Sequence, residues 1–400
     1  MRSPNVTYLQ GVDHCRAFAA TLIVYYHCTL FLGMARSGGS PATEPAGEWL
    51  RASNPLAALM IEGHTAVGFF IVLSGFIFAY GAAGREVRYW PFLRNRLLRI
   101  YPLFLTLVFL TISAFPKRFD VLGLLATVGA LANYPGALGV LPFTVMIWTI
   151  GVEMQFYLMF PFLNAHLNRE GPRPIWMLIP TAILLRGLGV VGGGDVHMLT
   201  YQTIFGRIDQ FALGMLAAHL WRSGRIDPAT LRRGLLPAIA VVLAVLFGFN
   251  RLGGWPAEAP WKISWPTIEG AAWATFLLCY LGATRNWEGR LATLLARIGE
   301  LSFSMYLLHH PIAWLLVQHG WVIDPGWGRP VAAVLTTTIV ALPVVLAVSK
   351  LTYTVSLRSS STLADSPSAS TRAASPPTSR LSSPAVARIT TLSTSASPTP

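Results

Sequence analysis

Long apolar stretches recur along the chain, and short segments between them carry most of the charged residues. Each stretch holds about 20 residues, enough for a helix to cross the roughly 30 Å hydrocarbon core of a bilayer. Helices are expected because lipid offers the backbone no hydrogen-bonding partner. The pattern predicts ten spans, at about residues 12–32, 64–83, 98–115, 144–163, 175–191, 202–221, 235–250, 266–283, 299–318 and 331–351.

The composition indicates the same class of protein. The chain is 53% hydrophobic and only 12% charged, whereas soluble domains carry about 25% charged residues. A chain of 400 residues with so little charge cannot cover a water-facing surface. We therefore predict an all-α fold, a polytopic integral membrane protein with about ten transmembrane helices. The three cysteines, Cys15, Cys28 and Cys279, fall in apolar stretches and match no metal or disulfide spacing, so we expect them to be small packing residues.

A net charge of +13 raises the question of a nucleic-acid partner, but arginine and lysine also collect in the cytoplasmic loops of membrane proteins. With ten spans and both termini in the cytoplasm, the inside loops hold fourteen basic residues and the outside loops seven. The segment 119–142 is apolar but broken by Pro135 and Pro142. Counting it as a further span would put two basic loops outside, so we expect ten spans, cytoplasmic termini and no nucleic acid.

The chain changes character near Ser356, after which serine, threonine, proline and alanine dominate. Such a segment buries too little apolar surface to offset the entropy of ordering it. We predict a membrane domain over residues 1–355 and a disordered tail over residues 356–400.

Ionisable residues within apolar stretches are the informative ones, because each is costly in lipid and must face protein or water. The first stretch holds Asp13, Arg16 and His27. In a helix, Arg16 and His27 are about 16 Å apart along the axis and only about 20° apart around it. A cation near the mouth and a deeper imidazole suit an anionic donor and a general base. The alternative for His27 is a structural hydrogen bond between helices.

The stretch WTIGVEMQFYLMFP contributes Trp148, Glu153 and Tyr157. Glu153 stands alone in an apolar run, so it must pair, be protonated or line a wet cavity. It either orients His27 or positions an acceptor, or it forms an ion pair with an arginine, Arg16 or Arg186.

The segment FLRNRLLRIYP carries Arg94, Arg96 and Arg99. Arg96 and Arg99 are three residues apart and share a helix face. A guanidinium cluster matches phosphate geometry, so the phosphates of coenzyme A are a candidate ligand. The alternative is that these arginines serve membrane topology alone.

Five further polar positions lie in apolar stretches. Ser74 sits in a glycine-containing segment without the surroundings of a nucleophile, and Arg207 and Asp209 are candidates for a mutual ion pair. Tyr306 and His309 lie in IGELSFSMYLLHHPI, where His309 either faces a cavity or bonds to its own backbone near a proline. The sequence has no phosphate-binding glycine loop and no metal-binding cluster, so we expect no metal and no tightly bound cofactor.

These segments, in this order, resemble acyltransferase family 3, the bacterial membrane O-acyltransferases that act on carbohydrates. The similarity begins in YLQGVDHCRAFAATLIVYYH, where Arg16 and His27 form the family's Arg-x10-His pattern. It continues through VGFFIVLSGFIFAY, FLRNRLLRIYP, WTIGVEMQFYLMFP, GRIDQFALG and LSFSMYLLHHP, and covers roughly residues 8–353. Each segment alone is weak evidence, whereas six in register are specific.

The resemblance implies a ten-helix enzyme of the bacterial cytoplasmic membrane. It would transfer an acyl group, often acetyl, from acyl-CoA as co-substrate to a sugar hydroxyl of a cell-envelope polysaccharide or a glycosylated small molecule. The expected partners are acyl-CoA, a carbohydrate acceptor and membrane lipid. The expected site consists of catalytic His27, Arg16 and Glu153, donor-binding Arg94, Arg96 and Arg99, and a cavity with Asp13, Ser74, Trp148, Tyr157, Tyr306 and His309.

The C-terminus departs from the family pattern. Members usually close the last helix with a Tyr-x-x-Glu-x-Pro-like sequence, but here Tyr353 is followed by Thr354, Val355 and Ser356. The missing glutamate and proline bear on the stability of the last helix rather than on the chemistry of the site.

Two other classes of protein compete with an enzyme. A transporter or flippase of glycan or lipid precursors also places histidine, arginine and glutamate in the membrane. It would move an acceptor without consuming coenzyme A, and it gives no reason for the pair Arg96 and Arg99. A catalytically inactive scaffold is the third class, and the presence of Arg16, His27 and Glu153 together argues against it.

Overall fold

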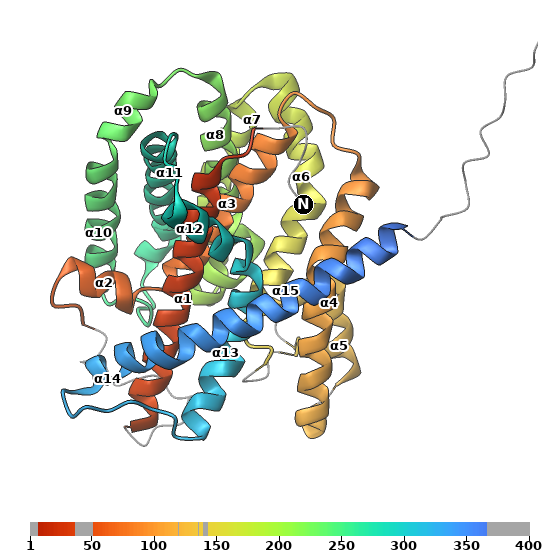
Figure 1. The fold of residues 1–400 in the computed structure, drawn as a ribbon. Helices are drawn as coiled ribbons and strands as arrows, with labels where there is room; N and C mark the ends of the chain where they lie inside the picture. The colour runs from red at the N-terminus through yellow and green to blue at the C-terminus, as the bar shows by residue number, and fades with distance from the viewer. Residues whose placement is uncertain (1–6, 37–50, 119, 135, 139–142, 366–400) are drawn as a thin grey trace, which may run out of the picture.

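The computed structural model describes residues 7–36, 51–118, 120–134, 136–138 and 143–365, and this part of the chain is helical without any strand (Figure 1). The helices in chain order are α1 (Gln10–Arg36), α2 (Pro55–Ile61), α3 (Thr65–Ala82), α4 (Tyr89–Ala114), α5 (Val121–Ala126), α6 (Trp148–Glu170), α7 (Arg173–Val191), α8 (Ile204–Ser223), α9 (Pro228–Arg233), α10 (Leu235–Arg251), α11 (Trp265–Thr284), α12 (Arg290–Glu300), α13 (Ser302–Gln318), α14 (Arg329–Thr336) and α15 (Leu342–Asp365). Short helical turns join them at η1 (Pro116–Arg118), η2 (Thr127–Leu131), η3 (Met198–Gln202), η4 (Pro260–Ser264) and η5 (Thr337–Ala341).

Each of the ten predicted spans coincides with a helix: α1, α3, α4, α6, α7, α8, α10, α11, α13 and the continuous run α14–η5–α15. Among the described helices, five are long and apolar enough to cross a membrane, namely α3, α4, α6, α7 and the run at 331–354. The pair α12 and α13, bent by 66°, would make six. The all-α polytopic fold is thus confirmed, and membrane crossing by α1, α8, α10 and α11 stays a prediction.

The segment 119–142 does not form a long helix in its described part. Asp120 caps α5 by accepting hydrogen bonds from the backbone N–H groups of Leu122 and Gly123. Helical structure then ends after the π-helical turn η2, where Ala130 has φ of 69°. The apolar helix at 121–131 would be about 16 Å long, half of the hydrocarbon thickness. This supports leaving the segment out of the count of spans.

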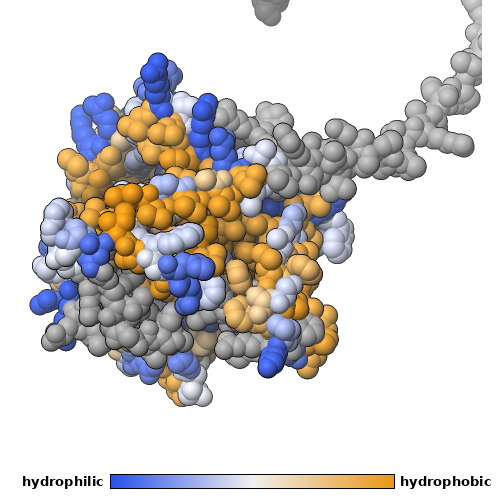
Figure 2. Space-filling view, turned by 60° about the horizontal axis from the view of Figure 1, so that its bottom comes forward, coloured by the Kyte–Doolittle hydropathy of each residue, from blue (hydrophilic) through white to orange (hydrophobic). Residues whose placement is uncertain are grey.

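The outer helices present apolar side chains at the surface. On α7, Trp176, Met177 and Leu188 are more than half exposed, and Phe109 of α4 is 68% exposed. Figure 2 shows hydrophobic side chains covering much of one face of the molecule, with scattered hydrophilic ones. Such a surface suits a lipid environment rather than water.

Helices α3 and α8 form the most extensive helix pair, near the middle of the bundle (Figure 1). Two glycines allow their backbones to touch. A Cβ atom on Gly75 would lie 2.2 Å from the carbonyl oxygen of Phe211, and one on Gly214 would lie 2.1 Å from that of Val72. Small residues let membrane helices approach this closely, so the pair forms a tightly packed centre.

The C-terminal helix α15 packs on α13 and α4 and continues past the predicted domain boundary at residue 355, to Asp365. The rest of the predicted disordered tail, residues 366–400, lies outside the described residues. The three cysteines are free and buried, as predicted.

Candidate functional site

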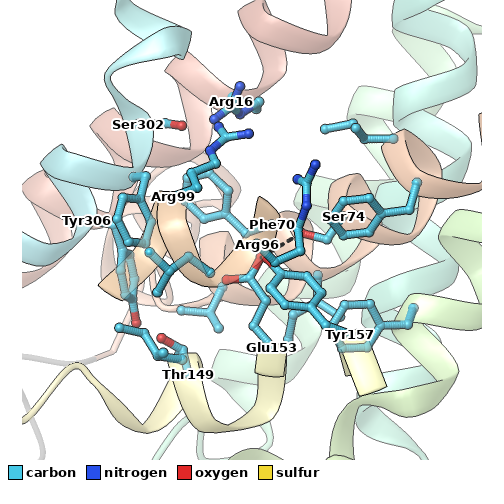
Figure 3. Close-up of a pocket in the computed structure, with 18 residues that line it drawn as sticks. Arg16, Phe70, Ser74, Arg96, Arg99, Thr149, Glu153, Tyr157, Ser302 and Tyr306 are labelled. Carbon is cyan, nitrogen blue, oxygen red and sulfur yellow. Dashed lines mark hydrogen bonds between the residues drawn. The ribbon is translucent and has the colours of Figure 1, made fainter. Parts of the chain in front are cut away.

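One cavity of about 170 Å³ opens between six helices, α1, α3, α4, α6, α8 and α13 (Figure 3). Seven of the twelve residues predicted for the site line this cavity: Arg16, Ser74, Arg96, Arg99, Glu153, Tyr157 and Tyr306. The other lining residues are Val67, Phe70, Ile71, Ile77, Phe78, Ile100, Thr149, Ile150, Phe211, Ser302 and Phe303. Arg16 and Tyr306 both line the cavity although they are 290 residues apart in the chain, so distant segments converge on the site.

Three guanidinium groups face the cavity from two helices, Arg16 from α1 and Arg96 and Arg99 from α4 (Figure 3). The spacing of Arg96 and Arg99 puts both on one face of α4, as predicted. Arg94 is exposed and does not line the cavity, because two residues along a helix correspond to a turn of about 200°. The structure therefore separates Arg94 from the other two arginines.

Each cavity arginine is held differently. Arg16 forms an ion pair with Asp13, with 2.9 Å between Nη1 and Oδ1, and the Tyr8 hydroxyl donates to the other Asp13 oxygen. Arg96 lies over the Phe78 ring, 4.9 Å from its centroid, without an ion pair in the described parts of the chain. Arg99 also forms none among the described residues and is exposed. Asp13 therefore positions Arg16 rather than lining the cavity.

Glu153 is the single carboxylate among the residues that line the cavity. Its Oε1 accepts a hydrogen bond of 2.5 Å from the Tyr157 hydroxyl and one of 3.4 Å from Ser74. The alternative ion pairs with Arg16 and Arg186 are absent in the described residues, where Arg16 pairs with Asp13 and Arg186 with another carboxylate. Three arginines against one glutamate leave the cavity with an excess of positive charge, which favours an anionic ligand.

His27 does not line this cavity but lies in a separate histidine cluster. Its Nδ1 is 3.0 Å from Nε2 of His309, and its ring also lies 5.8 Å from that of His310. Tyr306 joins the two regions, since it lines the cavity and its ring centroid is 5.7 Å from that of His309. The predicted interhelical hydrogen bond of His27 is present, and so is the backbone bond of His309, to the carbonyl of Met305.

The model of the acyltransferase domain that defines acyltransferase family 3 matches residues 9–350, most of the chain. This chain belongs to acyltransferase family 3. It is a multi-pass membrane O-acyltransferase, and the predicted family is confirmed.

Curated relatives of this acyltransferase are found in several bacteria. It is 28% identical to the exopolysaccharide production protein ExoZ of Rhizobium meliloti over 70% of this chain and 86% of ExoZ. It is 25% identical to the O-acetyltransferase OatA of Staphylococcus aureus over 78% of this chain, which spans about half (51%) of the length of OatA. It is 24% identical to the acyltransferase MdmB of Streptomyces mycarofaciens over 71% of this chain and 77% of MdmB. No solved structure matches.

The acyltransferase also contains a buried polar network that the sequence analysis did not predict. Arg207 forms an ion pair with Glu269 at 3.4 Å, and Arg186 forms one with Asp209 at 2.9 Å. The predicted pairing of Arg207 with Asp209 is wrong. Residues two apart on a helix point in nearly opposite directions, so they cannot face each other. These pairs join α7, α8 and α11 and balance their own charges, which suits a structural role.

A second part of the network surrounds Glu62, which lies between α2 and α3. Glu62 accepts a hydrogen bond of 2.7 Å from Asn250 and lies 3.5 Å from His64. Burial raises the pKa of Glu62 from 4.5 to about 7, although the hydrogen bond and the charge of Lys262 oppose this shift. Residues such as Glu62 carry no sequence signal beyond a charge beside an apolar stretch.

Trp148, the last of the predicted site residues, is half-buried at the start of α6 and packs against the apolar core rather than lining the cavity. Among the lining residues that were not predicted, Thr149 and Ser302 are the polar ones. Both lie inside segments that carried the family resemblance, and their polarity in apolar surroundings was the available signal.

Proposed function

We propose that this acyltransferase takes an acyl group, acetyl in the simplest case, from acyl-CoA and transfers it to a hydroxyl of a carbohydrate. The observation that carries the donor assignment is the set of Arg16, Arg96 and Arg99 around one cavity with a single carboxylate. Guanidinium groups form paired hydrogen bonds with phosphates, and coenzyme A is a thioester carrier with several phosphates. In this proposal Arg96 and Arg99 bind those phosphates.

The separation between the arginine cavity and His27 suits an elongated donor. Arg16 and His27 are eleven residues apart on α1, or about 16 Å along the helix axis. The phosphates would lie at the arginines, and the pantetheine arm would carry the thioester past Tyr306 toward His27. An α-helix that places both groups on one side provides the orientation that such a transfer needs.

The proposed reaction is a direct transfer with His27 as general base. Nε2 of His27 takes the proton of the acceptor hydroxyl while its oxygen attacks the thioester carbonyl carbon. The carbon–sulfur bond then breaks, and the coenzyme A thiolate receives the proton from His27. The products are an ester and free coenzyme A. Arg16, fixed by Asp13, stabilises negative charge on the donor.

The acceptor class is proposed from the relatives. One is an exopolysaccharide production protein, one an O-acetyltransferase and one an acyltransferase. A sugar hydroxyl of a cell-envelope polysaccharide or of a glycosylated small molecule is the acceptor that this set supports best. We further propose residence in the bacterial cytoplasmic membrane with both termini inside. This orientation puts the basic loops, and the end of α4 that carries Arg96 and Arg99, on the cytoplasmic side, where acyl-CoA is made.

The test is release of free coenzyme A from acetyl-CoA by membranes that contain the wild type, His27→Ala or His166→Ala, with and without sugar-containing extracts. His166 is a matched control, because it is an exposed histidine at the far end of α6, where it pairs with Glu170. Release that needs the extract and His27 but not His166 supports the proposal. Equal release by the wild type and His27→Ala would overturn the role of His27, and no release with any extract would favour a transporter.

A further inference from the structure

Two histidines far apart in the sequence meet between α1 and α13. His27 and His309 are 282 positions apart, and their facing nitrogens, Nδ1 of His27 and Nε2 of His309, are 3.0 Å apart. His309 is completely buried, whereas His27 is half-buried. A contact of this length between two ring nitrogens requires one to donate and the other to accept.

Backbone carbonyls decide which nitrogen carries each proton. Nδ1 of His309 lies 3.1 Å from the carbonyl oxygen of Met305. A carbonyl only accepts, so this nitrogen must be protonated, and Nε2 of a neutral His309 is then a pure acceptor. Nδ1 of His27 lies 3.2 Å from the carbonyl oxygen of Ile23, so it too must carry its proton. Both carbonyls therefore give one consistent direction, with His27 Nδ1–H donating to His309 Nε2.

This direction leaves Nε2 of His27 without a proton. Among the described residues, the hydrogen bonds of His27 involve only Nδ1. An imidazole nitrogen with a free lone pair is the form that a general base needs. The Ile23 carbonyl lies on the same helix as His27 and also takes part in the backbone hydrogen bonding of that helix. His309 comes from another helix, so it is the partner that also fixes the plane of the His27 ring.

We propose that His309 is the positioning residue of this enzyme, which fixes the tautomer and orientation of His27 so that Nε2 faces the acceptor hydroxyl. This inference rests on the proposed function. When Nε2 takes the hydroxyl proton, the new imidazolium keeps donating its Nδ1–H to Nε2 of neutral His309, whose lone pair stabilises the positive charge. When the coenzyme A thiolate takes that proton back, both rings return to their starting forms. His309 itself neither gains nor loses a proton.

Three variants test this proposal. His309→Leu removes the acceptor, and His309→Gln keeps an oxygen acceptor near the position of Nε2. His219→Leu is the control, because His219 is a half-buried histidine on α8 that belongs neither to the cavity lining nor to the histidine cluster. The assay is extract-dependent release of coenzyme A, with kcat and the KM for acetyl-CoA measured separately.

We expect kcat of His309→Leu to fall about 100-fold or more with the KM for acetyl-CoA within about twofold, since general-base catalysis contributes that much and donor binding lies elsewhere. His309→Gln and His219→Leu should stay within about tenfold of the wild type. Full kcat in His309→Leu, or equal losses in His309→Leu and His309→Gln at equal amounts of folded protein, would overturn the role of His309 while leaving the proposed function intact. A wild type that releases no coenzyme A with any extract would overturn both.

Discussion

The two arginines of α4 that face the cavity offer the sharpest perturbation of donor binding. Arg96→Gln and Arg99→Gln each remove one positive charge while keeping a polar side chain of similar length. Arg94→Gln makes the same change on the same helix, at an exposed residue outside the cavity. If the guanidinium groups bind the donor, the first two variants must weaken binding and the third must not.

The expected magnitude follows from the surroundings of each side chain. A hydrogen bond to a charged group contributes about 1.5–3 kcal/mol, or roughly 10- to 150-fold in a binding constant. Arg96 is half-buried over the rings of Phe78 and Phe92, so its loss should fall near the upper end. Arg99 is more exposed than Arg96, and screening weakens the contribution of an exposed charge, so its loss should fall near the lower end.

The assay is the KM for acetyl-CoA in coenzyme A release, together with direct binding of coenzyme A to detergent-solubilised protein. Direct binding needs no acceptor and so measures the donor site alone. Raising the salt concentration should weaken coenzyme A binding to the wild type more than to the double variant Arg96→Gln/Arg99→Gln. The double variant lacks the two positive charges whose attraction to the phosphates is screened by salt.

Two results would refute the reasoning. Unchanged coenzyme A binding in the double variant would show that these arginines serve membrane topology alone. An equal loss in Arg94→Gln would show that the effect arises from the general charge of the segment rather than from the cavity.

Three further outcomes follow from the structure. Gly214→Ala should cost about 3 kcal/mol of stability by driving a methyl group into the facing backbone. Gly81→Ala, with open space around it on α3, should be neutral or stabilising by up to about 1 kcal/mol, because alanine favours a helix over glycine. Thermal aggregation of solubilised protein compares the two variants, and equal stability would contradict the close contact. Glu153→Gln should lower the KM for acetyl-CoA about threefold or more by removing the one carboxylate that repels the donor, and a raised KM would contradict this. Glu62 has a pKa of about 7 in the folded protein and near 4.5 when unfolded, so its contribution to stability is present below pH 4.5 and is lost as pH rises through 7. Glu62→Gln should flatten that part of the profile of Tm against pH, and an unchanged slope would speak against the raised pKa.

The helices were predictable because each depends on local sequence. Apolar stretches of about 20 residues specify a membrane helix whatever their neighbours are. The shared face of Arg96 and Arg99 followed from their spacing of three residues in the same way. Arg94 was included because of its residue type, and helical geometry alone would have excluded it.

Contacts between distant segments were not predictable. Nothing in the spacing of residues links His27 with His309, which lie 282 positions apart, or Arg207 with Glu269, 62 positions apart. The position of His27 outside the arginine cavity was also unforeseen, since periodicity gives the direction of a side chain on its own helix but not which neighbouring helices surround it. By contrast, the bond between Tyr157 and Glu153 spans four residues and could have been read from helix geometry.

The backbone contact between α3 and α8 has a consequence for the shape of the site. Neither helix can slide or rotate past the other without driving atoms into the facing main chain. Ser74 of α3 and Phe211 of α8 both line the cavity, so these two side chains stand on one rigid support. This side of the cavity is therefore formed before any ligand arrives, and binding there does not have to order it.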